Sequence, residues 1–215
     1  MLRDLSFLSL TPSLYSHRNI RVISFDPQKD DAKYASFYID GPISTVQLTT
    51  KKKIVDGGGL RDSAVHLLVA SLAGFACIYK CDLLTPISYQ PSTGPEEAPK
   101  NFFDEPQILE DTLNPGDSVL CIYEAQFPTL GGSCIFVGTY KGQMMVFEKS
   151  EAGGYSLSLR RKLPHSIHKF GIGDINNDGI VEVVVLTKYS VHVFARSIKE
   201  IAQMSLQRGK RKDLL

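Results

Sequence analysis

The sequence predicts an all-β protein of the β-propeller class, and three observations lead to this prediction. Short runs of β-branched and aromatic residues recur along the 215 residues. Several of these runs come in pairs that are separated by a few turn residues. The last two pairs are 47 to 48 residues apart, a period typical of one propeller blade, and a longer spacer separates the earlier pair from them.

The repeat is clearest in the second half of the chain. The strand pair Cys134–Thr139 and Met144–Phe147 has a later copy at Glu182–Thr187 and Val191–Phe194. Paired short strands at such a period are the usual sequence pattern of propeller blades.

The predicted partial propeller spans residues 16–196, and its blades follow one another along the chain. We expect them at about 20–40, 41–117, 118–164 and 165–196. In the first of these, residues 20–25 and 34–39 are the outer strands of a blade whose beginning is missing. The N-terminal segment 1–15 stays unplaced.

The second predicted blade contains an earlier copy of the strand pair. Ile43–Leu48 alternates apolar and polar residues, as a half-buried strand does, and Val55–Gly59 is flexible turn material. The strand pair follows at Leu67–Ser71 and Ala76–Tyr79. Six of the 11 prolines lie between residues 85 and 116, which predicts a long surface loop that carries one short outer strand.

The third blade is expected to have strands near residues 118–124, 134–139, 143–149 and 155–162, and the last copy, 166–196, supplies three. After it, the apolar residues of 197–208 fall on one side of a helix, so 197–215 is predicted to be a short C-terminal helix and a basic tail. These elements make about three blades of a larger propeller. An open stack of blades leaves strand edges unpaired, so we expect a fragment or an incomplete gene model, with remaining blades supplied by another chain as the alternative.

Composition excludes several classes of function. The net charge is +1, and the basic clusters at Lys51–Lys53 and 208–212 have no interleaved aromatic residues, so we interpret them as a solvated loop and a solvated terminus and expect no nucleic-acid partner. The cysteines fit small buried hydrophobes better than metal ligands, and no signal peptide or glycosylation acceptor is present. No apolar run is long enough to cross a bilayer. We therefore expect a cytoplasmic protein without direct membrane insertion.

Catalytic motifs do not support an enzyme. Neither Gly-X-Ser-X-Gly nor a P-loop sequence occurs, and the glycines at 57–59 are more typical of a loop than of a phosphate cradle. His165 and His168 lie in a turn without a third metal ligand. His66 and His192 are expected to be satisfied sheet residues. We predict no catalytic residues.

One loop has the chemistry of a metal site. It places oxygen donors at alternating positions around Gly179, and the predicted ligands of a calcium ion are Asp174, Asn176, Asp178, Ile180 through its carbonyl, and Glu182. It is not an EF-hand, because the twelfth position is Val185 rather than a bidentate Glu. The alternative is a turn in which Asp174 and Asn176 cap backbone amides without metal.

Several short sequence motifs, taken in their order and spacing, resemble the C-terminal half of kaptin-family proteins over most of residues 20–207. They are Asp40–Ser44, Leu68–Ser71, Asp117–Cys121, Thr139–Tyr140, and the 174–182 loop followed by Val191–Val193. The resemblance implies a propeller with FG-GAP or WD40-like blades. It also places the acidic loop where integrin-α propellers hold calcium, whereas the copy at 126–129 in the preceding blade has lost the acidic residues.

The resemblance further implies a non-catalytic subunit of the KICSTOR scaffold. Such a subunit pairs with an FG-GAP-repeat propeller subunit and other KICSTOR subunits. The scaffold recruits a GATOR-type complex to the lysosome, where the protein would be peripheral, and it negatively regulates TORC1 signalling in response to amino acid and glucose availability. The alternatives are an actin-filament-binding protein of lamellipodia and stereocilia, with F-actin as the partner, and a calcium-binding integrin-α-like propeller.

Overall fold

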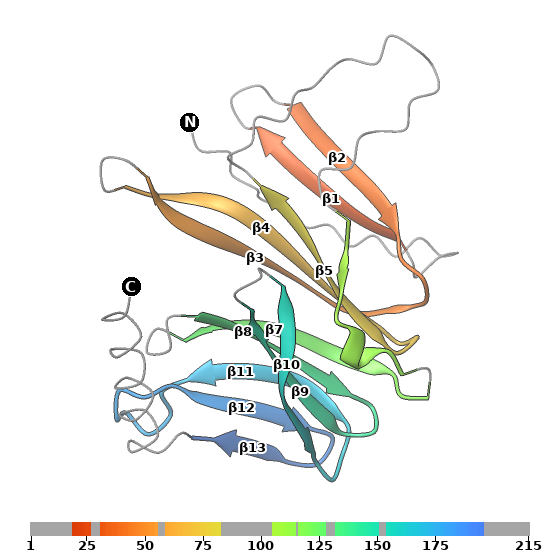
Figure 1. The fold of residues 1–215 in the computed structure, drawn as a ribbon, viewed down its shortest axis with the longest axis vertical. Helices are drawn as coiled ribbons and strands as arrows, with labels where there is room; N and C mark the ends of the chain where they lie inside the picture. The colour runs from red at the N-terminus through yellow and green to blue at the C-terminus, as the bar shows by residue number, and fades with distance from the viewer. Residues whose placement is uncertain are drawn as a thin grey trace. The chain divides into compact units, whose positions relative to one another are not determined.

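The computed structural model describes residues 19–26, 31–55, 59–82, 105–114, 116–127, 132–150 and 154–195. Within these ranges the backbone forms strands β1 to β13 and one short 3-10 helix, η1 (Figure 1). The strands pair antiparallel in two four-stranded sheets, one three-stranded sheet and one two-stranded sheet. The predicted all-β class with blade-like sheets is therefore confirmed.

The chain divides into two compact units, residues 1–122 and 123–215, and each unit is described by itself. The boundary falls within strand β7, Val119–Phe127. The segment 1–15 and the C-terminal segment 197–215 lie outside the described residues, so the predicted helix stays a prediction.

The first unit begins with a two-stranded sheet. Strand β1, Asn19–Asp26, pairs antiparallel with β2, Asp31–Tyr38, from Asn19 opposite Tyr38 to Asp26 opposite Asp31. Strands were predicted at 20–25 and 34–39. The second of these begins earlier than expected, because its pairing with β1 extends to the end of the hairpin.

The second sheet has the order β3-β4-β5-β6. Its strands are β3, Ile43–Val55; β4, Gly59–Ser71; β5, Phe75–Asp82; and β6, Gln107–Ile108. The helix η1, Glu110–Thr112, follows β6 directly. The short strand predicted in the proline-rich stretch is thus β6, which pairs with β5 as the outer strand of this sheet.

The lysine cluster Lys51–Lys53 corrects one prediction. We expected a solvated loop there, but these residues continue β3 and pair with β4, where Lys51 lies opposite Ala64 and Lys53 opposite Arg61. The charge of the three lysines favoured a loop. Their backbone instead pairs with β4, and a register shift between Lys51 and Lys52 marks an irregularity in this pairing.

The core of the first unit lies between β1 and the β3–β6 sheet. Ile20, Leu67 and Val69 are fully buried there, and Cys77 is nearly so. Partly buried side chains from β3 and β5 pack against them. Alternate residues of each strand supply this apolar face, which is why the period-2 pattern at Ile43–Leu48 predicted the strand correctly.

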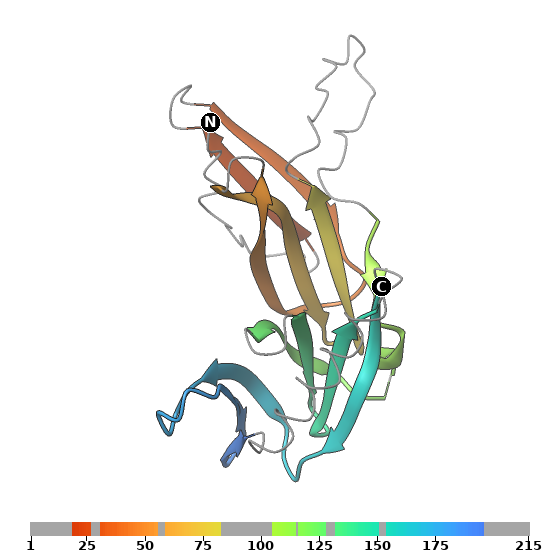
Figure 2. The same ribbon diagram turned by 60° about the vertical axis from the view of Figure 1, so that its left-hand side comes forward.

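The second unit contains the sheet ordered β10-β9-β8-β7. After β7 come β8, Gly132–Thr139; β9, Gln143–Lys149; and β10, Tyr155–Lys162. Figure 2 shows β8, β9 and β10 side by side. These positions agree with the four strands predicted for this part of the chain, and β8 and β9 carry the most buried runs, as central strands do.

The last sheet is three-stranded, in the order β11-β12-β13. Its strands are β11, Ile167–Gly173; β12, Glu182–Thr187; and β13, Val191–Phe194. Phe170 of β11 packs on Phe136 of β8 with ring centroids 5.5 Å apart, and the ring centroid of Phe127 of β7 lies 6.1 Å from that of Phe136. This aromatic cluster joins the two sheets of the unit.

A hydroxyl-capped turn ends the second strand in three of the sheets. Ser71, Thr139 and Thr187 end β4, β8 and β12, and each is buried. Their side-chain oxygens accept the backbone N–H groups of Ala73 at 3.2 Å, Gln143 at 3.0 Å and Ser190 at 3.1 Å, respectively. Thr139 and Thr187, which are 48 residues apart, thus carry the same side-chain chemistry at the spacing that predicted the repeat, and Ser71 carries it after a longer spacer.

Candidate functional site

The acidic loop connects β11 to β12, and Asp174 starts it directly after β11 ends at Gly173. The two carboxylate oxygens of Asp174 accept different backbone amides: Oδ1 accepts the N–H of Asp178 at 3.1 Å, and Oδ2 accepts that of Gly179 at 2.8 Å. One side chain therefore folds the following five residues back toward itself.

Asn176 and Asp178 add a second layer of turns to this loop. Asn176 Oδ1 accepts the N–H of Asp178 at 3.0 Å, and its amide group donates to Asp178 Oδ2 at 2.9 Å. Asp178 Oδ1 accepts the N–H of Ile180 at 2.8 Å. Asn177 and Gly179 have φ angles of 58° and 83°, the left-handed conformation that Asn tolerates and Gly adopts without a Cβ penalty.

Glu182, the first residue of β12, contributes the third carboxylate and the only buried one. It is 2% exposed. Its Oε2 accepts the N–H of Ile175 at 2.8 Å, whereas its Oε1 is buried and has no hydrogen-bond partner among the described residues. A buried carboxylate oxygen without a partner is costly and requires an explanation.

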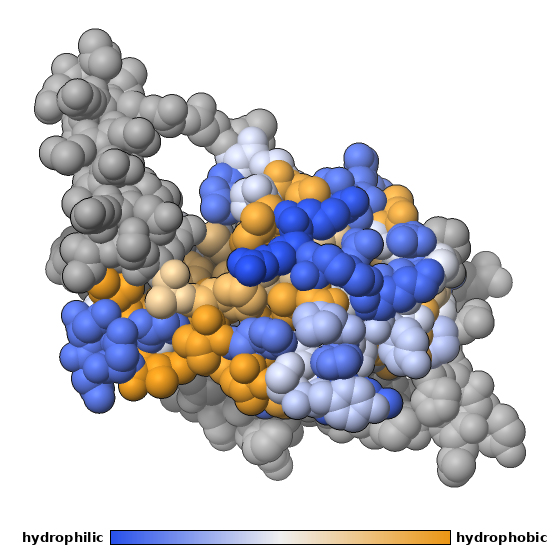
Figure 3. All heavy atoms as spheres, turned by 90° about the horizontal axis from the view of Figure 1, so that it is seen from below, coloured by the Kyte–Doolittle hydropathy of each residue, from blue (hydrophilic) through white to orange (hydrophobic). Residues whose placement is uncertain are grey.

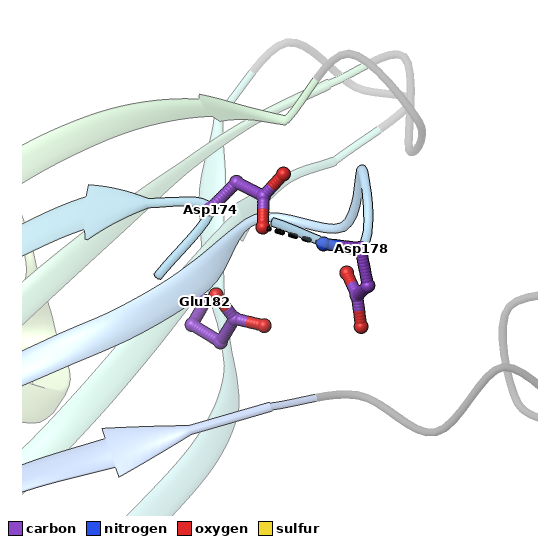
Figure 4. Close-up of side chains that lie close together, drawn as sticks. All are labelled: Asp174, Asp178 and Glu182. Carbon is purple, nitrogen blue, oxygen red and sulfur yellow. Dashed lines mark hydrogen bonds between the residues drawn. The ribbon is translucent and has the colours of Figure 1, made fainter. Parts of the chain in front are cut away.

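The three carboxylates converge, as Figure 4 shows. One ligand oxygen from each of Asp174, Asp178 and Glu182 lies within 4.8 Å of the others. Asp174 and Asp178 are exposed, so solvent and ions reach the cluster from the loop side. Geometrically, the arrangement can hold a cation.

The sequence-predicted ligands thus fall into two groups. Asp174, Asp178 and Glu182 are brought together, whereas the side chain of Asn176 is engaged by hydrogen bonds to Asp178. Ile180 lies in the same loop, where its backbone N–H donates to Asp178 Oδ1. In the preceding sheet, the corresponding copy at 126–129 begins in β7, and its residues 128–129 lie outside the described residues, so the loss of its acidic residues stays a prediction from the sequence.

The histidines considered earlier make other contacts. His168 lies in β11 rather than in the predicted turn, and its Nε2 lies 3.1 Å from the hydroxyl of Ser166. The ring of His165 meets that of Tyr189 edge-on, with the ring centroids 4.9 Å apart. His192 Nε2 lies 2.9 Å from the hydroxyl of Ser190. Ring and hydroxyl contacts of this kind fix side chains at the turns of the last sheet.

A hollow in the second unit was not foreseen. It has a volume of about 320 Å³, and Phe127, Phe136, Val146 and Phe194 are among its lining residues. The guanidinium of Arg161 lies 4.9 Å from the ring centroid of Phe194 at the same place. Because the hollow forms between two sheets, no local sequence pattern indicates it.

Four exposed apolar side chains lie on β12, on β13 or in the turn between them. Leu186, Tyr189, Val191 and Val193 are 44%, 69%, 60% and 51% exposed. Figure 3 shows one face of the molecule, on which hydrophobic and hydrophilic areas lie side by side. Such apolar positions are common where a protein meets a partner.

Comparison with known proteins identifies one family. The family model for KICSTOR complex protein kaptin matches residues 19–206, most of the chain. No curated protein matches the sequence significantly. Among the described residues, no helix has both the length and the apolar character needed to cross a membrane.

Proposed function

The chain belongs to the kaptin family of KICSTOR complex proteins, and from this membership we propose that it acts as a non-catalytic propeller subunit of a KICSTOR-type scaffold. The match over residues 19–206 carries the proposal, because it covers both compact units of the chain. Association with other KICSTOR subunits follows from the family.

The finer role extends this proposal. The scaffold recruits a GATOR-type complex to the lysosomal membrane, with this subunit at its periphery, and it restrains TORC1 when amino acids or glucose are scarce. Within the scaffold, the chain pairs with an FG-GAP-repeat propeller subunit. A subunit of this kind works by shape, through strand edges and loops that contact its partners.

The edge of the last sheet supports such a contact. Among the described strands, β13 pairs only with β12, and Val191 and Val193 are more than half exposed on it. An apolar edge strand is a favourable surface for a second sheet protein. We place the contact with the FG-GAP-repeat propeller there.

A signalling experiment tests the scaffold role. Cells that lack the protein are starved of amino acids, and phosphorylation of TORC1 substrates is measured before and after the full chain is restored. We expect phosphorylation to persist in its absence and to fall again when the wild type is restored. Normal loss of phosphorylation in the deleted cells would contradict the proposal.

Variants of the edge strand β13 distinguish the loss of a contact surface from the loss of folded protein. Val193→Lys places a charge on the proposed contact, and Leu113→Lys, at a 56% exposed position in the first unit, is the matched control. We expect the Val193 variant to restore starvation sensitivity less well than the control, at equal abundance. Cosedimentation with actin filaments that persists at physiological salt would instead favour the alternative function, actin binding.

A further inference from the structure

The 174–182 loop brings three carboxylate groups close together. Asp174, Asp178 and Glu182 each place an oxygen within 4.8 Å of the others. Within the described ranges, their contacts are backbone amides and the amide of Asn176, which are dipoles rather than charges. Like charges at this separation repel, and the repulsion is strongest where one of them is buried.

Glu182 provides an independent observation that points to a ligand. This residue is only 2% exposed, and its Oε1 has no hydrogen-bond partner among the described residues. In Figure 4 its carboxylate extends toward the space shared with Asp174 and Asp178. Capping turns alone explain why Asp174 and Asp178 accept amides. They leave the buried oxygen of Glu182 unexplained.

A cation in this space would satisfy both observations. It would balance the three carboxylates, and it would give Oε1 of Glu182 the partner that no described protein group supplies. The amide bonds to Asp174 and Asp178 do not prevent this, because each carboxylate oxygen can accept more than one contact. All donors in the loop are oxygens, which excludes a preference for the softer transition metals.

We propose that residues 174–182 bind one calcium ion, with Asp174, Asp178 and Glu182 as the charged ligands. Asn176, the carbonyl of Ile180 and water complete the oxygen shell. Calcium fits this loop better than magnesium, because calcium accepts irregular shells of six to eight oxygens whereas magnesium demands a near-ideal octahedron and sheds its water reluctantly. The site is independent of the proposed scaffold function.

Calorimetric titration of the full chain with calcium alone and with magnesium alone tests the proposal. We expect saturable calcium binding with one ion per chain and weaker binding of magnesium. Thermal melting supplies a second measure: at a free calcium concentration about 100 times the Kd, the melting temperature should rise by about 5–10 °C. Absence of both effects overturns the site, and equal binding of magnesium overturns its selectivity.

Glu182→Gln separates a metal ligand from a structural acid. The Gln side chain keeps an oxygen for the amide of Ile175 but loses the buried charge. Without calcium, we expect this variant to melt at or above the wild-type temperature. With calcium, it should melt below the wild type, because its affinity falls by about 10-fold or more. Parallel calcium responses in both proteins would overturn the assignment of Glu182.

Two further variants keep the test decisive. Asp178→Asn changes an exposed ligand and therefore preserves the fold if Glu182→Gln does not. It should also weaken calcium binding by about 10-fold. Glu148→Gln removes one exposed carboxylate of β9 outside the loop and should bind calcium as the wild type does. Equal losses in the Asp178 and Glu148 variants would indicate nonspecific charge attraction and overturn the site.

Discussion

Replacing Gly142 by alanine should disrupt the turn between β8 and β9. Gly142 has a φ of +81°, and a Cβ added there would lie 2.6 Å from the carbonyl oxygens of both Leu163 and His165. The N–H of Leu163 donates to the carbonyl of Gly142 at 2.8 Å, so the two segments cannot separate without losing this bond. The turn thus needs glycine for its backbone angle and for the close approach.

The expected loss of folding free energy is the sum of two costs, one from the backbone angle and one from the close approach. Left-handed backbone costs a non-glycine residue about 1–2 kcal/mol, and forcing an added methyl group against fixed backbone costs about 1–3 kcal/mol. The total of about 2–5 kcal/mol corresponds to a fall in melting temperature of roughly 4–20 °C for a chain of this size. Thermal melting followed by circular dichroism measures it.

Gly171→Ala is the matched control for this prediction. Gly171 lies in β11, has no positive φ, and an added Cβ would meet nothing within 4 Å. Its replacement should leave stability unchanged or raise it by about 0.4–1 kcal/mol, because alanine restricts the unfolded chain. If Gly142→Ala melts within a degree of Gly171→Ala, the reasoning on the turn is refuted.

Three other perturbations test the core and its chemistry. Thr139→Val removes the oxygen that accepts the N–H of Gln143 and should cost about 1–3 kcal/mol in urea unfolding, whereas Thr139→Ser should cost less; equal losses would show that the hydroxyl is not what matters. Burial raises the pKa of the Cys77 thiol from 9.0 to about 12, and burial beside Glu124 raises that of Tyr155 from 10.0 to about 12. The unfolded chain releases these protons at a lower pH than the folded chain does. The contribution of the two groups to the free energy of unfolding is therefore fully present below pH 9 and should fall as the pH rises toward 12. A melting temperature that stays constant over this range would contradict the burial of both groups. Phe136→Ala empties the centre of the aromatic cluster and should cost about 3–5 kcal/mol, so a loss below 1 kcal/mol would mean that the two sheets are not held together there.

The positions of the strands could be predicted from the sequence, because each blade repeats the same requirement for an apolar face. Thr139 and Thr187 were matched as the ends of two copies of the same strand pair, and the structure places both at the ends of second strands, with the same hydroxyl-capped turn. The prediction of a loop at Lys51–Lys53 was wrong. It rested on the charges of these three residues alone, whereas their strand structure depends on pairing with β4, which a short sequence window does not contain.

The candidate site was predictable in part. The alternation of oxygen donors predicted five calcium ligands, and the structure brings three of them, Asp174, Asp178 and Glu182, within 4.8 Å of one another, while the metal itself stays a proposal. The unpartnered Oε1 of Glu182 could not be foreseen, because burial depends on how β12 packs in the folded unit. The hollow beside Phe136 escaped prediction for the same reason.

The central claim is that this kaptin-family chain is a subunit of a KICSTOR-type scaffold, and co-purification tests it most directly. The tagged full chain is expressed in its own cells, purified at physiological salt and analysed by quantitative mass spectrometry. We predict that an FG-GAP-repeat propeller subunit and further KICSTOR subunits co-purify in stoichiometric amounts. Recovery of the folded chain without any KICSTOR subunit would contradict the claim.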